Sequence, residues 1–177
     1  DPESIFHFRV TLDYYTQVNS IQLPDKRDEA FKYIKEAVRN YPELYFARIV
    51  IIGEGDSEEV VFNRLMQVLN TEFDDNLISF VPLGGRFVNH VWRLLKALNI
   101  PYATLLDLDL ERHGGDWGRI KYAIKELLKI LPAGLEVELL TLEGHLLTAI
   151  ELEEMHLRPI AKDDINKWVV KLRGFNV

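Results

Sequence analysis

Short apolar runs alternate with amphipathic stretches along most of the chain, and this alternation predicts the order of its secondary structure. Four runs have the length and residue content of strands: 48–52, 77–81, 102–106 and 137–142. Between them, apolar residues recur at helical spacing in three stretches: 56–70, 87–98 and 116–130. This order predicts an α/β fold, in which right-handed crossovers build a mostly parallel four-stranded sheet flanked by helices.

The two ends of the chain carry different patterns. Near the start, Phe6, Phe8, Val10 and Leu12 alternate with other residues at the period of a half-buried strand, and residues 26–40 then predict a helix. Near the end, two stretches predict helices, 145–157 and 163–172. We therefore expect three parts: an N-terminal strand and helix arm (1–44), a central α/β domain (45–145) and a C-terminal helical extension (146–177).

Composition narrows the classes of function. The chain of 177 residues contains no cysteine, which excludes disulfides, thiolate zinc sites and a cysteine nucleophile. Asp and Glu outnumber Lys and Arg by 28 to 21, and the net charge of −7 disfavours a nucleic-acid binder that relies on a broad basic face. No apolar run approaches the roughly 18–20 residues that span a bilayer, so we expect a cytoplasmic protein with no membrane partner. The opening Asp1-Pro2-Glu3 lacks a methionine and a signal-peptide pattern, and we expect the chain to be part of a longer one.

Acidic residues follow two of the four predicted strands. Gly53-Glu54-Gly55 comes after the first run, and Asp107-Leu108-Asp109 comes after the third. Ligands of open α/β sheets bind beyond the carboxyl ends of strands, and alternate residues of an extended segment point to one side. If the two strands are neighbours, Glu54, Asp107 and Asp109 converge, and three carboxylates tolerate each other mainly when cations lie between them. Such all-oxygen ligands suit Mg²⁺ or Mn²⁺ and not Zn²⁺.

Each acid also has a purely structural interpretation. Asp56 and Glu59 have the spacing of an N-terminal capping box, and Glu58 is equally a first-turn acid favoured by the helix dipole. Glu54 taken alone is a common kind of turn residue. It is the combination of an acid between glycines at one strand end with an Asp-x-Asp at another that favours a metal site.

Four motifs in order resemble the Toprim domain of the OLD (overcoming lysogenization defect) family of ATP-dependent nucleases, over about residues 42–143. They are Pro42-Glu43-Leu44-Tyr45-Phe46-Ala47, Gly53-Glu54-Gly55-Asp56-Ser57-Glu58, Val81-Pro82-Leu83-Gly84-Gly85-Arg86-Phe87, and Ile100-Pro101-Tyr102 leading into Leu106-Asp107-Leu108-Asp109. Larger members of the family place an ATPase before this domain, and residues 5–21 resemble the closing strands of such an ATPase. Gly53 stands where the family more often has valine.

The resemblance implies roles for individual residues. Glu54 matches the signature glutamate, Glu58 the second acid of the first motif, and Asp107 and Asp109 the Asp-x-Asp ligands. A further acid is expected after the fourth strand, where Glu143 is the best candidate and Glu136 and Glu138 lie close by. A C-terminal basic residue is also expected, with three candidates that the sequence does not rank: Lys162, Lys167 and Lys171.

The function that the resemblance implies is DNA endonuclease activity. Two cations roughly 3.5–4 Å apart activate a water molecule, neutralise the phosphate and stabilise the leaving oxygen. We expect catalytic roles for Glu54, Asp107 and Asp109, with Mg²⁺ or Mn²⁺ held by these three residues, Glu58 and Glu143. The expected partners are DNA, an ATPase domain of the full-length chain and a second copy of the protein, in phage defence or DNA repair. The alternatives are a non-catalytic Toprim module for assembly or DNA binding, and a topoisomerase-like or primase-like Toprim enzyme.

Overall fold

The computed structural model describes residues 5–11, 13–20, 29–68, 78–83, 88–159 and 161–177. The chain divides into two compact units, residues 1–105 and 106–177. The domain boundaries expected from the motifs, after residues 44 and 145, stay predictions.

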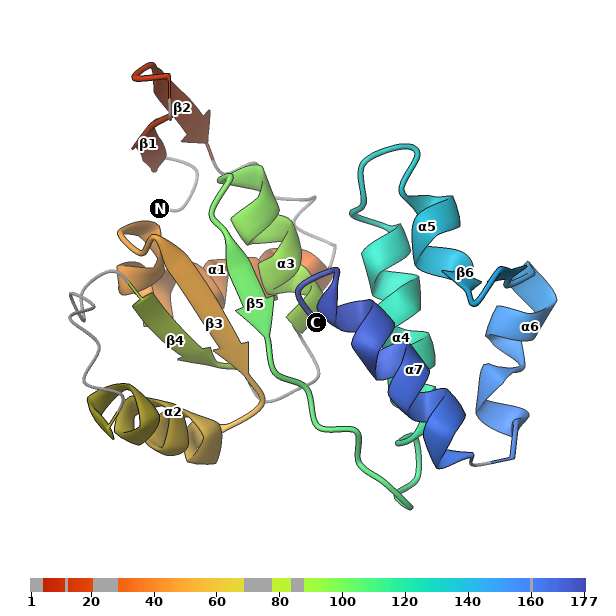
Figure 1. Cartoon of the computed structure of the whole chain (residues 1–177). Helices are drawn as coiled ribbons and strands as arrows, with labels where there is room; N and C mark the ends of the chain where they lie inside the picture. Colours follow the sequence, from red (N-terminus) through yellow and green to blue (C-terminus); the bar gives the residue numbers. More distant parts are fainter. Residues whose placement is uncertain (1–4, 12, 21–28, 69–77, 84–87, 160) are drawn as a thin grey trace. The chain divides into compact units, whose positions relative to one another are not determined.

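A three-stranded parallel sheet forms the centre of the first unit (Figure 1). The strands are β3 (Ile49–Gly53), β4 (Ile78–Pro82) and β5 (Tyr102–Thr104), in the order β4-β3-β5. The register pairs Ile52 of β3 with Val81 on one side and with Thr104 on the other. The Leu105 N–H donates to the carbonyl of Ile52 at 2.8 Å, so β3 and β5 end at the same edge of the sheet.

Three helices of this unit confirm most of the helical predictions. They are α1 (Glu29–Asn40), α2 (Asp56–Val68) and α3 (Val88–Ala97), together with a 3₁₀ turn, η2 (Pro42–Tyr45). On α3 the apolar face is fully buried, because Val88, Val91, Trp92 and Leu95 recur at helical spacing. The Trp92 indole N–H donates to Thr104 Oγ1 at 2.7 Å inside the core, which ties α3 to the end of β5.

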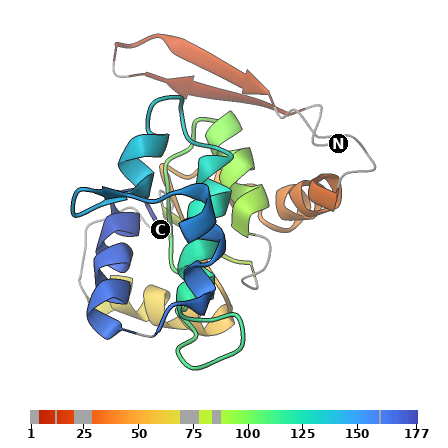
Figure 2. The same ribbon diagram turned by 90° about the vertical axis from the view of Figure 1, so that its right-hand side faces the viewer.

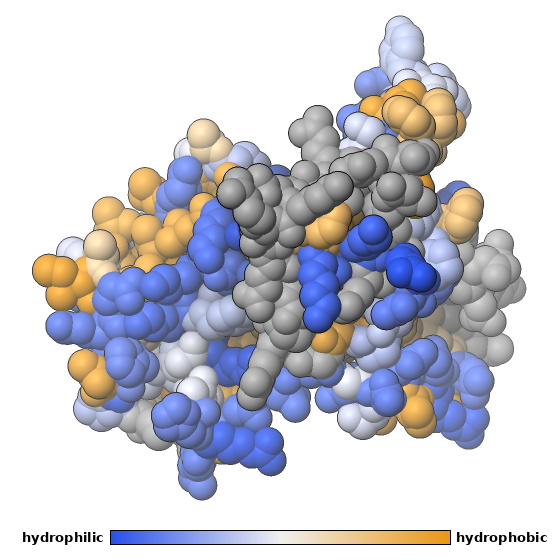
Figure 3. All heavy atoms as spheres, turned by 180° about the vertical axis from the view of Figure 1, so that it is seen from behind, coloured by the Kyte–Doolittle hydropathy of each residue, from blue (hydrophilic) through white to orange (hydrophobic). Residues whose placement is uncertain are grey.

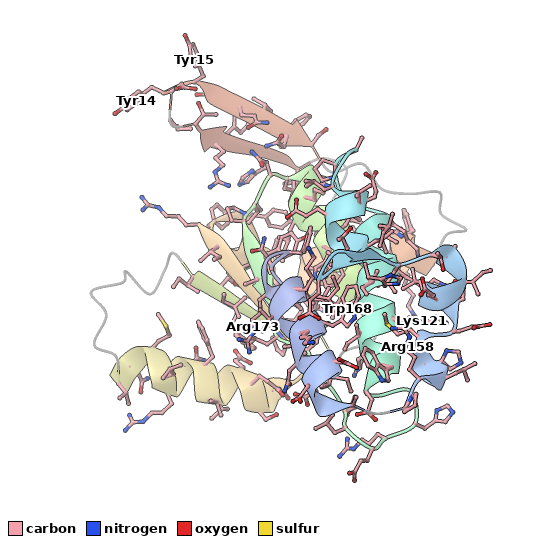
Figure 4. All side chains as sticks on the ribbon, turned by 45° about the vertical axis from the view of Figure 1, so that its right-hand side comes forward. Tyr14, Tyr15, Lys121, Arg158, Trp168 and Arg173 are labelled. Carbon is pink, nitrogen blue, oxygen red and sulfur yellow. The ribbon has the colours of Figure 1, made fainter. Side chains whose placement is uncertain are left out.

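The predicted N-terminal strand is a hairpin of β1 (Phe6–Val10) and β2 (Thr16–Ser20), which Figure 2 shows from the side. Its alternation is real, but Phe6, Phe8 and Val10 are exposed and form an apolar patch (Figure 3). The opposite face is polar, and Asn19 donates to the carbonyl of Leu98 at 3.1 Å. Tyr14 at the hairpin tip is also exposed (Figure 4).

The second unit is helical and packs around α4 (Trp117–Leu128). The other elements are α5 (Glu136–Leu140), β6 (Thr141–Leu142), β7 (His145–Leu146), α6 (Ala149–Glu153), the 3₁₀ turn η4 (Met155–Leu157) and α7 (Lys162–Arg173). Its core joins Ile120, Ile124 and Leu127 of α4 to apolar residues of the neighbouring elements, among them Leu139, Met155, Ile165 and Trp168. Trp168 lies on the side of α7 that packs against α4 (Figure 4). Trp92, Trp117 and Trp168 are all buried in the core.

The prediction of a fourth parallel strand over residues 137–142 is wrong. These residues form the end of α5 and the two-residue strand β6, which pairs antiparallel with β7. The alternation of Glu136, Val137, Glu138 and Leu139 is compatible with a strand or with a single helical turn. The helical turn places Leu139 in the core with none of its side chain exposed, and Thr141 Oγ1 donates back to the carbonyl of Val137 at 2.7 Å.

The helix predicted over residues 145–157 is also shorter than expected. Glu143 and Gly144 have positive φ angles of 49° and 82° and make the turn that pairs β6 with β7. Helix α6 begins only after Thr148, whose side chain forms a reciprocal capping box with Glu151. That box holds the pKa of Glu151 down to about 2, because the Thr148 N–H and hydroxyl both donate to its carboxylate.

Among the described residues, no helix is both long and apolar enough to cross a membrane.

Candidate functional site

Glu54 lies in the bend between β3 and α2, at the carboxyl edge of the sheet, and is half-buried. The Gly53 carbonyl accepts from the Leu83 N–H at 2.9 Å, which fixes the backbone just before Glu54. A β-carbon at Gly53 would lie 2.9 Å from Cε1 of Phe80 and closer still to Cζ, so the Phe80 ring would have to shift to make room for a side chain. The ring therefore occupies the space that the side chain of the valine expected from the resemblance would need.

Glu58 lies one helical turn beyond Glu54, in the first turn of α2, and is half-buried. Its Oε2 accepts from the hydroxyl of Ser57 at 3.0 Å and would lie 3.2 Å from a β-carbon at Gly55. The carboxylate of Glu58 therefore turns back toward the loop that carries Glu54. The α2 dipole, positive at this end, favours such acids with or without a metal.

Tyr41 lies in the negative electrostatic potential of the same edge of the sheet. Its hydroxyl donates to the carbonyl of Pro82, the last residue of β4, at 2.7 Å. The pKa of Tyr41 is raised, mainly by burial and further by the charges of Asp56 and Glu59. The end of the sheet that carries Glu54 is thus an acidic environment.

Asp107 and Asp109 follow β5 in an extended segment that begins the second unit. Asp107 is exposed, and Asp109 is half-buried. Both oxygens of Asp109 contact guanidinium groups: Oδ2 accepts from Arg119 Nη2 at 2.8 Å and from Nε at 3.2 Å, and Oδ1 accepts from Arg112 Nη1 at 3.3 Å. In this structure Asp109 is therefore neutralised by basic side chains of its own unit.

A compact loop from Asp109 to Asp116 holds this carboxylate in place. The Asp116 N–H donates to the Leu108 carbonyl at 2.8 Å, and Asp116 Oδ2 accepts from the Glu111 N–H at 3.0 Å. Asp109, Glu111 and Asp116 all have positive φ angles, between 49° and 63°, which are unusual for residues other than glycine. At Gly115 a β-carbon would lie 2.9 Å from Cβ of Asp109 and closer still to its carbonyl, so only glycine fits there.

Glu143 stands in the β6–β7 turn with a largely exposed side chain. Its Oε2 accepts from Lys167 Nζ at 2.8 Å, and this bond raises the pKa of the lysine. Both residues line a cavity of about 380 Å³ in the second unit, whose floor includes Trp117 and Trp168. Lys167, one of the candidate lysines, therefore contacts a predicted metal ligand.

The predicted five-acid site is divided between the two units, with Glu54 and Glu58 in the first and Asp107, Asp109 and Glu143 in the second. Within the described parts of the chain, no three Asp, Glu or His side chains are grouped closely enough to hold a metal ion. The donor set nevertheless suits a hard divalent cation, since all five candidates are carboxylates. Asp109 and Glu143 each already bind a cationic side chain. The assignment of these acids as metal ligands stays a prediction.

Two further segments contain residue types that can bind an anion, a Gly-Gly-Arg segment before a helix and a loop histidine. Gly84-Gly85-Arg86 lies outside the described residues. His113 is exposed in the turn of the Asp109–Asp116 loop.

Comparison with known proteins places these residues in a family. Residues 45–109 match the model of the overcoming lysogenization defect protein-like TOPRIM domain, a range that includes Glu54, Asp107 and Asp109. Over residues 45–109 the chain therefore matches an OLD-like TOPRIM domain. It is also 27% identical over 92 residues to Endonuclease GajA of Bacillus cereus (strain VD045). That alignment covers 51% of this chain and 16% of the relative's length, so the chain spans a small part of the endonuclease that it matches.

Sequence reasoning did not single out Arg119 as a partner of Asp109. Arg119 is the third residue of α4, and the first turn of that helix contains no acid. A basic residue at the positive end of a helix opposes the dipole, which favours a nearby acid. The sequence does not show which acid that is, because Asp109 lies ten residues before Arg119 and Asp116 directly precedes the helix.

Proposed function

We propose that this chain is the metal-dependent nuclease part of an OLD-family endonuclease and hydrolyses phosphodiester bonds in DNA. The observation that carries the proposal is the position of the matched acids at strand ends that are neighbours. Glu54 directly follows β3, and Asp107 lies two residues beyond Leu105, whose N–H bonds to β3. Parallel pairing of β3 with β5 brings the two exits of the chain to one edge of the sheet.

In this proposal Glu54, Asp107 and Asp109 hold one divalent cation, Mg²⁺ or Mn²⁺, and Glu58 and Glu143 complete a second site. The ions, when bound, supply a water acidified toward neutral pH and charge neutralisation for the phosphate. We assign to Glu54 the role of accepting the proton of the attacking water. Lys167, which the structure pairs with Glu143, is the basic residue that we assign to the developing negative charge.

The wider setting is part of the same proposal. The acidic chain, at a net charge of −7, needs bound cations before DNA can approach these carboxylates. An ATPase domain in the full-length protein and a second copy of the chain are the proposed protein partners. Phage defence and DNA repair are the proposed settings.

A plasmid assay tests the proposal. The 177-residue chain is incubated with supercoiled DNA and Mg²⁺ or Mn²⁺, and nicked or linear products are expected. Asp107→Ala should abolish them, because the site loses a ligand and a negative charge. Glu143→Gln should reduce cleavage strongly, whereas Glu138→Gln, an exposed acid on α5, should leave it unchanged.

Other outcomes identify the alternatives. Relaxed closed circles would indicate topoisomerase-like chemistry. Intact supercoiled DNA with both the unmodified chain and Asp107→Ala would refute the nuclease assignment and favour a non-catalytic TOPRIM module.

A further inference from the structure

Arg119 is held at the Asp-x-Asp motif by more than one contact. Its Nη2 and Nε both donate to Oδ2 of Asp109, at 2.8 and 3.2 Å. Its side chain also lines a small cavity of about 70 Å³ together with Asp107. The guanidinium therefore contacts Asp109, and Arg119 and Asp107 line the same cavity.

The environment makes this contact stronger than an ordinary surface pair. The side chains of Arg119 and Asp109 are 21% and 22% exposed, so solvent screens them only partly. Arg112, the other partner of Asp109, is 79% exposed and donates one bond at 3.3 Å. Charge-assisted bonds of the Arg119 kind are about twice as strong as neutral ones. Arg119 is therefore the dominant cation at Asp109 in this structure.

We propose that Arg119 is a built-in competitor of the divalent cation at the Asp107–Asp109 pair. This inference rests on the proposed function, because it concerns the metal ligands assigned there. A carboxylate oxygen that accepts two N–H bonds from a guanidinium has to give them up before it binds a metal ion. Arg119 thus keeps Asp109 paired with a cation when no metal is bound and lowers the affinity of the Asp107–Asp109 pair for the metal. It acts as a positioning residue for Asp109.

Direct measurement of Mn²⁺ binding to the full 177-residue chain tests this role, by calorimetry or by the electron paramagnetic resonance signal of free Mn²⁺. Arg119→Gln keeps the polar side chain but removes the charge. It is expected to bind Mn²⁺ about tenfold more tightly than the unmodified chain, the size of one charged hydrogen bond. Arg112→Gln is the matched control and should change the affinity by less than about twofold, as for an exposed ion pair. In the double variant Asp109→Asn with Arg119→Gln the gain should disappear.

A purely structural role for Arg119 predicts the opposite result, because loosening the site would weaken Mn²⁺ binding. Equal or weaker binding by Arg119→Gln, with a circular dichroism spectrum like that of the unmodified chain, would overturn the inference. If Arg119→Gln does not fold, Arg119→Lys provides the test. Lysine keeps the charge but loses the planar pair of donors, so a gain of about threefold is expected, and no gain would contradict the proposal.

Failure of this inference is distinguishable from failure of the proposed function. Plasmid cleavage by the unmodified chain, with no gain in Mn²⁺ affinity in Arg119→Gln, refutes the competitor role and leaves the nuclease assignment standing. Absence of both cleavage and Mn²⁺ binding in every variant refutes both.

Discussion

Replacing Gly53 by valine, the residue more common at this position in the family, is expected to destabilise this chain. Gly53 ends the central strand β3 and is buried. In a strand without steric conflict, replacing glycine would stabilise the protein, since glycine costs roughly 0.5–1 kcal/mol relative to alanine. Here the new β-carbon would lie 2.9 Å from Cε1 of Phe80 and 3.3 Å from Cβ of Glu58. Steric conflict should therefore outweigh the backbone gain.

The magnitude follows from how little room there is. Overpacking a core typically costs about 1–3 kcal/mol, so after the backbone gain of about 0.5–1 kcal/mol we expect a net loss of about 0.5–2 kcal/mol. The ring of Phe80 cannot withdraw freely, because it is 9% exposed and packs on Phe62 with ring centroids 5.2 Å apart. Phe80→Leu removes the conflicting ring atoms, so the double variant should be destabilised by about 1 kcal/mol less than the sum of the two single variants.

Urea unfolding followed by far-ultraviolet circular dichroism measures these free energies. Gly118→Ala is the matched control, because a β-carbon at that helical position meets no atom within 4 Å. It should gain about 0.4–1 kcal/mol. A Gly53→Val protein as stable as the unmodified chain, or additive effects in the double variant, would refute the explanation based on Phe80.

Three other predictions concern single contacts. Thr104→Val leaves the buried indole N–H of Trp92 without its acceptor and should cost about 1–3 kcal/mol in urea unfolding, and a loss below about 0.5 kcal/mol would contradict it. The pKa of Glu151 is lowered to about 2, so its contribution to stability is present above about pH 4.5 and is lost as the pH falls through about 2. Glutamine does not titrate, so the melting temperature of Glu151→Gln should fall less between pH 6 and pH 2 than that of the unmodified chain. An equal fall in the two proteins would argue against the capping box. Glu143→Gln should lower the pKa of Lys167 toward its ordinary value, as nuclear magnetic resonance titration would show, and an unchanged pKa would contradict the pairing.

The spacing of apolar residues correctly predicted those strands and helices whose apolar residues are buried in the core. The β3, β4 and β5 runs and the faces of α3 and α4 have apolar residues at the spacing of their elements, and these residues are in the core. The prediction of a strand over residues 137–142 was wrong because the alternation of glutamate and apolar residues there is compatible with a strand and equally with a helical turn. The burial of Leu139 in the core favours the helical turn over the strand. This tertiary packing cannot be seen in the local sequence pattern.

In the candidate site, too, some residues could be identified from the sequence and others could not. The acids were identifiable because glycines and strand ends flank them in order along the chain, and the family match covers Glu54, Asp107 and Asp109. Their counter-ions were not identifiable in the same way. Arg119 is ten residues from Asp109 and Lys167 is 24 residues from Glu143, and no spacing rule selects these partners. Such pairs depend on how α4 and α7 pack, which the sequence does not display.

Gly115 lies very close to the carbonyl of Asp109, so the two ends of the Asp109–Asp116 loop tolerate fewer substitutions than its exposed middle. Both ends are fixed by backbone bonds and by the lack of space at Gly115, whereas residues 110–114 are all exposed. Glu111 and Arg112 make hydrogen bonds that hold Asp116 and Asp109, and Gly114 has a φ angle of 83°, which favours glycine. The exposed position of His113 is therefore suited to a fluorophore or an affinity label, a reporter attached a few residues from Asp109 without altering the bonds that hold this acid.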